Sequence, residues 1–125
     1  MANKILLDAN ILMEVIFNRQ KSKECLNLIV NNFENAYISS LSVHICNYFL
    51  EKESGNIKEN GLFFAQFNKF ELNNDLLELA YSIYSKDFED AIQVASCLEN
   101  NCYEIYTLDK NMAKNYEHLL KIIIL

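Results

Sequence analysis

The stretch Lys4-Ile5-Leu6-Leu7-Asp8-Ala9-Asn10, near the start of the chain, decides the fold. Its unbroken apolar run is typical of a short strand that is buried on both faces of a parallel sheet. The run ends at Asp8, and helical spacing of apolar residues begins at Ala9 and extends to about Asn18. A buried strand that leads directly into an amphipathic helix favours an α/β architecture.

The alternation of strands and helices continues along the chain. Further strands are predicted at 36–39, 70–72, 104–107 and 121–124. Helices are predicted at 22–32, 41–53, 57–68, 76–83 and 87–100 and as a short segment after Asp109, and Asn74 and Asp75 are the expected caps of the 76–83 helix. We therefore expect one compact domain over residues 1–125, with a central, mostly parallel sheet of four to five strands flanked by helices in three layers.

Composition limits the possible classes of protein. The 125 residues are 51% hydrophobic and 22% charged, as in an ordinary globular domain. Two glycines and no proline argue against a turn-rich β-sandwich. We expect no membrane segment and no signal peptide, and hence a cytoplasmic protein. The four scattered cysteines (Cys25, Cys46, Cys97, Cys102) form no zinc motif and are predicted to be reduced core thiols.

The formal net charge of −6 argues against nucleic-acid binding through bulk electrostatics. Any such role requires a local basic patch or bound metal ions. Three lysines follow the last acidic residue of interest and are candidates for contact with RNA phosphates, although they are scattered: Lys110, Lys114 and Lys121.

Four aspartates are predicted to meet at one edge of the sheet. Asp8 follows the first strand, Asp109 follows the 104–107 strand, and Asp87 and Asp90 begin the helix that precedes that strand. Ligands in open α/β sheets bind beyond the carboxyl ends of the strands. Clustered carboxylates repel one another unless a cation compensates, and oxygen ligands suit Mg²⁺ or Mn²⁺. We expect phosphodiester hydrolysis with water as the nucleophile and no covalent enzyme intermediate.

Four stretches carry a resemblance to the PIN domain family, in the family's order and over essentially the whole chain. Ile5-Leu6-Leu7-Asp8-Ala9-Asn10 resembles the opening strand, and Tyr37-Ile38-Ser39-Ser40-Leu41-Ser42 resembles the second strand and its following helix. The remaining acidic motifs are matched by Asp87-Phe88-Glu89-Asp90-Ala91-Ile92-Gln93 and by Ile105-Tyr106-Thr107-Leu108-Asp109.

The resemblance implies a Mg²⁺- or Mn²⁺-dependent endoribonuclease that cleaves single-stranded RNA, as in the toxins of toxin–antitoxin pairs. It implies an antitoxin partner, and the aromatic and aliphatic content is compatible with a homodimer. The implied catalytic, metal-binding carboxylates are Asp8, Asp90 and Asp109, with Asp87 as an additional metal ligand. The implied supporting polar residues are Asn10, Thr107 and Gln93.

One position departs from the family pattern. Many PIN domains carry an acid on the helix after the second strand, and the best alignment places Ile45 there, beside His44 and two residues before Asn47. Loss of a carboxylate weakens metal affinity. A catalytically weakened PIN-like module that binds RNA or protein is therefore the alternative hypothesis.

Simpler interpretations accompany each candidate residue. Asp8, Asp87 and Asp109 can serve as helix caps, and Asp90 favours the positive end of its helix. His44 and Glu14 are expected to be solvated helix residues. Haloacid-dehalogenase-like phosphatases and receiver domains also place an aspartate after a strand, but the acids and lysine that those families require are missing from the corresponding positions.

Overall fold

The computed structural model describes residues 3–125 and contains one five-stranded, wholly parallel sheet. The strands are β1 (Ile5–Leu7), β2 (Ala36–Ser39), β3 (Asn68–Phe70), β4 (Glu104–Thr107) and β5 (Lys121–Ile124). Their order across the sheet is β3-β2-β1-β4-β5. The predicted parallel α/β sheet is confirmed, and the strand that opens the chain lies at its centre.

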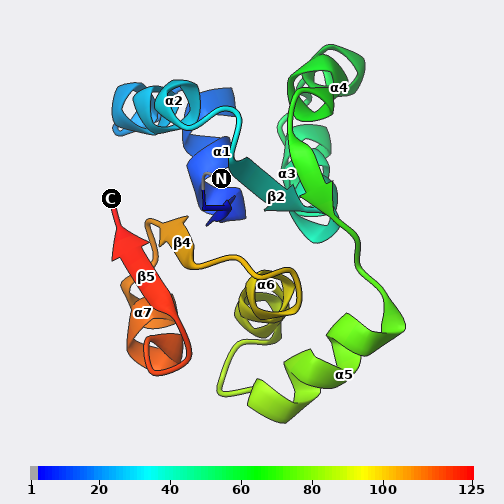
Figure 1. The fold of residues 1–125 in the computed structure, drawn as a ribbon. Helices are drawn as coiled ribbons and strands as arrows, with labels where there is room; N and C mark the ends of the chain where they lie inside the picture. Colours follow the sequence, from blue (N-terminus) through cyan, green and yellow to red (C-terminus); the bar gives the residue numbers. More distant parts are fainter. Residues whose placement is uncertain (1–2) are drawn as a thin grey trace.

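Seven helices cover the two faces of the sheet within the described residues (Figure 1). One face carries α1 (Ala9–Ile16), α2 (Ser22–Asn31), α3 (Ser40–Lys52) and α4 (Ile57–Ala65), and the other carries α5 (Asn74–Ile83), α6 (Phe88–Glu99) and α7 (Lys110–Tyr116). The apolar residues of β1 alternate between two core clusters: Ile5 and Leu7 pack with the first group of helices, and Leu6 packs with the second. This alternation produces the predicted three layers.

The strand order places a crevice beside Asp8. From β1 the chain builds outward to β2 and β3 on one side, and it then crosses to β4 and β5 on the other. The change of direction lies between β1 and β4, whose residues Leu7 and Tyr106 are paired. In open parallel sheets such a switch point separates the loops at the carboxyl ends of two adjacent strands and leaves room for a ligand.

The third strand and one helix cap differ from the sequence expectation. Helix α4 ends at Ala65 rather than near 68, and β3 covers 68–70 rather than 70–72. Phe70 stacks on Tyr37 with ring centroids 4.5 Å apart, whereas Leu72 is 41% exposed, so the buried aromatic rather than the leucine fixes the register. The cap of α5 is Asn73, whose side chain accepts from the backbone N–H of Leu76, and not Asn74 or Asp75.

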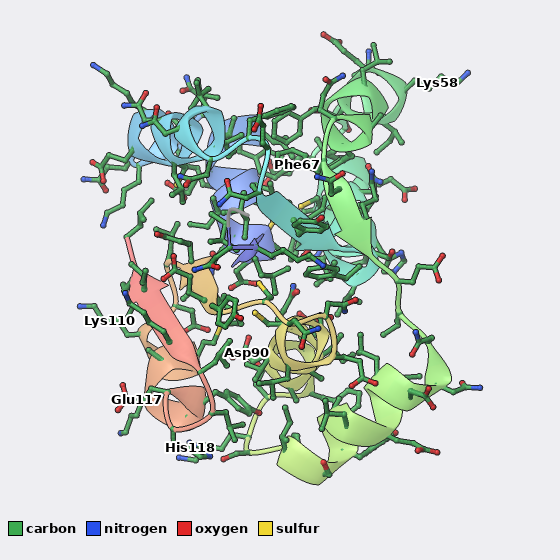
Figure 2. All side chains as sticks on the ribbon, in the orientation of Figure 1. Lys58, Phe67, Asp90, Lys110, Glu117 and His118 are labelled. Atoms are coloured by element: carbon green, nitrogen blue, oxygen red, sulfur yellow. The ribbon has the colours of Figure 1, made fainter. Side chains whose placement is uncertain are left out.

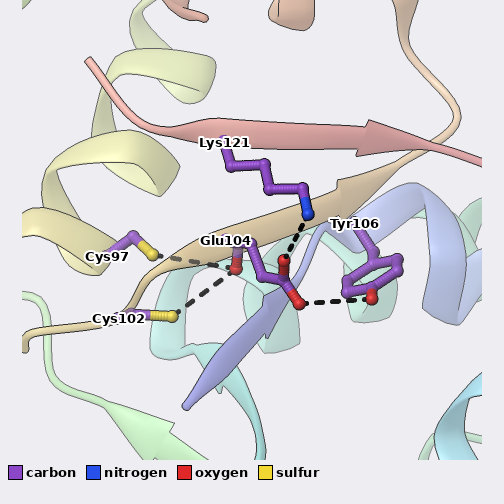
Figure 3. Close-up of polar contacts among 5 residues, drawn as sticks. All are labelled: Cys97, Cys102, Glu104, Tyr106 and Lys121. Carbon is purple, nitrogen blue, oxygen red and sulfur yellow. Dashed lines mark hydrogen bonds and ion pairs between the residues drawn. The ribbon is translucent and has the colours of Figure 1, made fainter. Parts of the chain in front are cut away.

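The four cysteines are free and buried, as predicted for core thiols. The Cys97 and Cys102 thiols both donate weak hydrogen bonds to the backbone carbonyl of Glu104, at 3.9 and 3.6 Å (Figure 3). The Glu104 carboxylate forms an ion pair with Lys121 of β5 at 3.6 Å. The Lys121 ammonium group is thus paired with a carboxylate at the start of β4.

Within residues 3–125, no helix has the length and apolarity needed to cross a bilayer.

Candidate functional site

The switch point holds a small acidic cavity of about 190 Å³. It is lined by the four predicted aspartates and by seven further residues: Asp8, Asp87, Asp90, Asp109, Ala9, Asn10, Met13, Ile45, Phe49, Glu89 and Gln93. Asp90 lies on the side of α6 that faces β4 and α7 (Figure 2). The structure therefore brings together carboxylates from the ends of β1 and β4 and from the start of α6.

Asp8 is fixed by hydrogen bonds on both carboxylate oxygens. The Ala9 backbone N–H donates to Oδ1 at 2.8 Å, and the Thr107 hydroxyl donates to Oδ2 at 2.8 Å. The side chain is 7% exposed. Asp8 is also the N-cap of α1, so the capping role and a place in the cavity coexist in one residue.

Thr107 and Asn10 form a support for Asp8. The Thr107 hydroxyl accepts from Asn10 Nδ2 at 3.1 Å and from the Asp109 backbone N–H at 3.0 Å while it donates to Asp8. Asn10 Oδ1 accepts from the Leu108 backbone N–H at 3.2 Å. A hydroxyl has one donor and two acceptor sites, so Thr107 is fully satisfied and holds the loop after β4 against the loop after β1.

Asp87 and Asp109 each use one oxygen as a helix cap. Asp87 Oδ1 accepts from the Asp90 backbone N–H at 3.1 Å at the start of α6. Asp109 Oδ1 accepts from the Asn111 backbone N–H at 2.8 Å at the start of α7. The second carboxylate oxygen of each residue accepts no hydrogen bond from residues 3–125, so capping does not exhaust either side chain.

The cavity carries more negative charge than its surroundings compensate. Burial raises the pKa of Asp8 to about 6; the hydrogen bonds from Thr107 and Ala9 oppose that rise, and repulsion from Asp109 and Glu89 adds to it. Burial also raises the pKa of Asp90 to about 7, with repulsion from Asp87 as the next largest cause. Burial and repulsion thus both disfavour the charged forms of these two carboxyl groups.

Gln93 contributes an unpartnered oxygen to this region. Its side chain is 1% exposed and lines the cavity, and Nε2 donates to the Ser42 hydroxyl at 2.8 Å. Ser42 is tied in turn to Ser39, the N-cap of α3. Gln93 Oε1 is buried and has no hydrogen-bond partner among the described residues. A buried carbonyl oxygen without a partner is costly and is suited to a ligand or a bound water.

These donors fit a hard divalent cation. Carboxylate and amide oxygens line the cavity, and no histidine or cysteine is among its lining residues. The raised pKa values of Asp8 and Asp90 indicate that a cation would relieve repulsion. Within residues 3–125, however, no three acidic, histidine or cysteine side chains already surround a common point as metal ligands. A cation would therefore have to draw the carboxylates of the cavity closer together.

The structure sorts the remaining sequence candidates. Ile45 lines the cavity, so its apolar side chain occupies the wall at which the family resemblance expects an acid. His44 is exposed, as expected. Glu14 accepts from the Lys21 backbone N–H at 2.9 Å and lines a different cavity.

Two site features were missed from sequence alone. Glu89 lines the acidic cavity, and its position between Asp87 and Asp90 was the available signal. The hydrogen bond between Gln93 and Ser42 joins α6 to α3, and the two residues are 51 positions apart, so no local sequence pattern predicts it.

The comparisons with known proteins agree with this geometry. The sequence model of the PIN domain matches residues 5–118. The chain belongs to the PIN domain family. PIN domains form a nuclease family whose members generally use divalent metal ions, so the fit of the acidic cavity to a cation agrees with the family assignment. No curated protein matches the chain significantly.

Solved structures show the same fold at low sequence identity. A toxin–antitoxin complex from Klebsiella pneumoniae has a TM-score of 0.75 and 18% identity, with 96% of each chain covered. The sarcin-ricin-loop-cleaving toxin VapC20 of Mycobacterium tuberculosis has a TM-score of 0.73 and 13% identity over 89% of this PIN domain and 94% of that chain. VapBC2 of Rickettsia felis, bound to a promoter DNA fragment, has a TM-score of 0.70 and 15% identity over 97% and 98%.

Proposed function

We propose that this PIN domain is a metal-dependent endoribonuclease that hydrolyses phosphodiester bonds in single-stranded RNA and that it is the toxin of a toxin–antitoxin pair. The observation that carries the proposal is the acidic cavity, in which burial and repulsion from neighbouring carboxylates raise the pKa values of Asp8 and Asp90 to about 6 and about 7. Such a cavity suits Mg²⁺ or Mn²⁺. Known structures with this fold include toxins and toxin–antitoxin complexes.

In this proposal Asp8, Asp90 and Asp109 hold the ion and Asp87 is an additional ligand. A divalent ion in such a site polarises the phosphodiester and lowers the pKa of an attacking water. Thr107 orients the Asp8 carboxylate through its 2.8 Å hydrogen bond, and Asn10 fixes Thr107.

Gln93 completes the proposed site. It presents its unpartnered Oε1 as a neutral acceptor for the ion or for a water.

Cleavage of a labelled single-stranded RNA tests the proposal. Wild type should cleave with Mg²⁺ or Mn²⁺ and lose activity in EDTA, and Asp8→Asn and Asp90→Asn should each lose about a hundredfold or more, because a preorganised charged group at the reacting centre is removed. Asp75→Asn, on α5 and outside the cavity, is the matched control. Equal cleavage by wild type and Asp8→Asn would identify a contaminating nuclease and contradict the proposal.

Ile45 supports a second candidate function. Because this apolar side chain forms part of the cavity wall, the site has one carboxylate fewer than the family pattern implies. A catalytically weakened module that binds RNA or protein fits that feature. The module is favoured if wild type binds RNA but shows no metal-dependent cleavage.

A cognate antitoxin and a homodimer are part of the main proposal. Apolar side chains on the outer face of α2 and after it are exposed, among them Leu26, Val30 and Phe33, and such surface is typical of interfaces. Sedimentation of the purified chain across a range of concentrations tests the dimer. A cytoplasmic location is also proposed, and the four free thiols fit a reducing compartment.

A further inference from the structure

A second cavity adjoins the acidic one and is lined by lysines and amides. It has a volume of about 360 Å³ and shares three aspartates with the acidic cavity: Asp87, Asp90 and Asp109. Its remaining wall consists of Lys86, Asn111, Lys114 and Asn115. Side chains with N–H donors thus lie beside the three shared aspartates.

The two lysines are electrostatically available. Within residues 3–125 the sole ion pair joins Lys121 to Glu104, so Lys86 and Lys114 form none, although three aspartates share their cavity. Both residues are exposed. Ammonium groups without an ion pair and amide N–H groups are hydrogen-bond donors that suit an anion.

Lys86 is held in a strained turn. The Asp87 backbone N–H donates to the Ser85 carbonyl at 3.1 Å, and Lys86, which lies between them, has a φ of 81°. This hydrogen bond and this φ together define the rarer, strained form of the γ-turn. The buried Tyr116 hydroxyl accepts from the Ser85 backbone N–H at 3.0 Å and lies 3.1 Å from the carbonyls of both Ser85 and Asp87. A side-chain-bearing residue kept in this conformation is typical of functional sites.

The two other lysines that follow Asp109 and were candidates for RNA contact do not share this arrangement. Lys121 is paired with Glu104, and Lys110 lines a separate cavity with Glu14 and Arg19. Of the three lysines that the sequence offered for RNA contact, only Lys114 therefore lies in the cavity that adjoins the carboxylates.

We infer that Lys86 and Lys114 bind the backbone phosphate of a nucleotide next to the one that is cleaved, and so position single-stranded RNA across the acidic cavity. This inference rests on the proposed ribonuclease function. The net charge of −6 repels RNA as a whole, so a local pair of cations is needed to hold the strand. Asn111 and Asn115 supply neutral donors to the same phosphate.

Binding of a non-cleavable, 2′-O-methylated single-stranded RNA, followed by fluorescence anisotropy in EDTA and in Mn²⁺, tests the inference. Lys86→Gln and Lys114→Gln should each weaken binding by about threefold or more, and each should reduce the slope of log affinity against log salt by about 0.7. Lys58→Gln removes the same charge from α4, remote from Asp90 (Figure 2), and should leave the slope unchanged.

The outcomes separate the two proposals. If wild type cleaves RNA with Mn²⁺ but both lysine variants keep the wild-type salt slope, the phosphate site is wrong and the nuclease stands. If wild type neither binds nor cleaves RNA, both fail. If inorganic phosphate displaces the labelled RNA as effectively as unlabelled RNA does, the lysines bind free anions and do not position RNA. Equal binding of an oligoglutamate peptide through the same lysines would replace RNA with an acidic protein segment.

Lys86→Gly examines the turn separately. Glycine adopts φ 81° without a Cβ penalty, so this variant should unfold at a Tm about 2 to 4 °C above that of Lys86→Gln while it binds RNA as weakly. A lower Tm for Lys86→Gly would show that the turn is not strained and would remove that support for the site.

Discussion

Thr107 and Asp8 lie 99 residues apart in the sequence and share a buried 2.8 Å hydrogen bond where β4 and β1 end side by side. The same hydroxyl accepts from Asn10 and from the Asp109 backbone N–H. One side-chain oxygen therefore sets the relative position of two of the proposed catalytic carboxylates.

Thr107→Val should destabilise the protein by about 1 to 3 kcal/mol, because it leaves the donors of Asn10 and Asp109 and one oxygen of Asp8 without their partner. Urea unfolding measures the change. Thr107→Ser keeps the hydroxyl and should recover most of the loss. Equal loss in both variants would show that the methyl group, and not the hydrogen bonds, matters.

Asp8→Asn should be more stable than wild type at neutral pH without metal. The folded-state pKa of Asp8 is raised from its ordinary value of 3.8 to about 6, so the folded protein binds more protons than the unfolded chain in this interval. The stability contributed by protonated Asp8 is complete below pH 3.8 and is lost as the pH rises through about 6.

The difference in unfolding free energy between Asp8→Asn and wild type should therefore grow from near zero below pH 4 to about 2 to 3 kcal/mol at pH 7. The amide carries an N–H where a protonated Asp8 carries an O–H, so Asp8→Asn mimics the protonated carboxyl group. Urea unfolding at stepped pH measures the difference. A constant difference across this range would contradict the pKa shift.

Mn²⁺ should raise the Tm of EDTA-stripped wild type and leave that of Asp8→Asn nearly unchanged. A ligand that binds only the folded state stabilises it by mass action, by about 2.7 kcal/mol at a hundred times its dissociation constant. Differential scanning fluorimetry with and without Mn²⁺ measures both proteins, and Asp75→Asn should respond as wild type does. An unchanged wild-type Tm would leave the acidic cavity without its proposed cation.

Ile45→Glu should lower stability without metal and strengthen Mn²⁺ binding. The new carboxylate would enter a cavity in which Asp8 and Asp90 already repel neighbouring carboxylates, so added repulsion would lower the stability of the metal-free protein. The same carboxylate would give the ion an additional ligand. Isothermal titration with Mn²⁺ should show an affinity increase of about tenfold. Ile45→Gln, which has the same size as the glutamate but no charge, should show no such gain.

Much of the site could be predicted because it follows from strand ends. Asp8 and Asp109 meet because each follows a parallel strand, and parallel neighbours end at the same edge. The register of β3 could not be predicted, since stacking of Phe70 on Tyr37 outweighs local propensity. The cap of α5 could not be predicted because Asn73, Asn74 and Asp75 are adjacent residues that all favour a cap position.

The hydrogen-bond partners of the site residues could not be predicted from local sequence patterns either. The contact between Ser42 and Gln93 depends on the packing of α3 and α6. The turn at Lys86 depends on the hydroxyl of Tyr116, about 30 residues further along the chain.

The central position of β1 has a consequence for the order in which the protein becomes functional during synthesis. Asp8 is translated about a hundred residues before its hydrogen-bond donor Thr107 and its neighbour Asp109. A nascent chain that has not released β4 lacks both the strand that pairs with β1 and one wall of the acidic cavity. A chain that ends before Thr107 therefore lacks both Asp109 and the hydroxyl that fixes Asp8, and it should not cleave RNA if the proposed activity is correct.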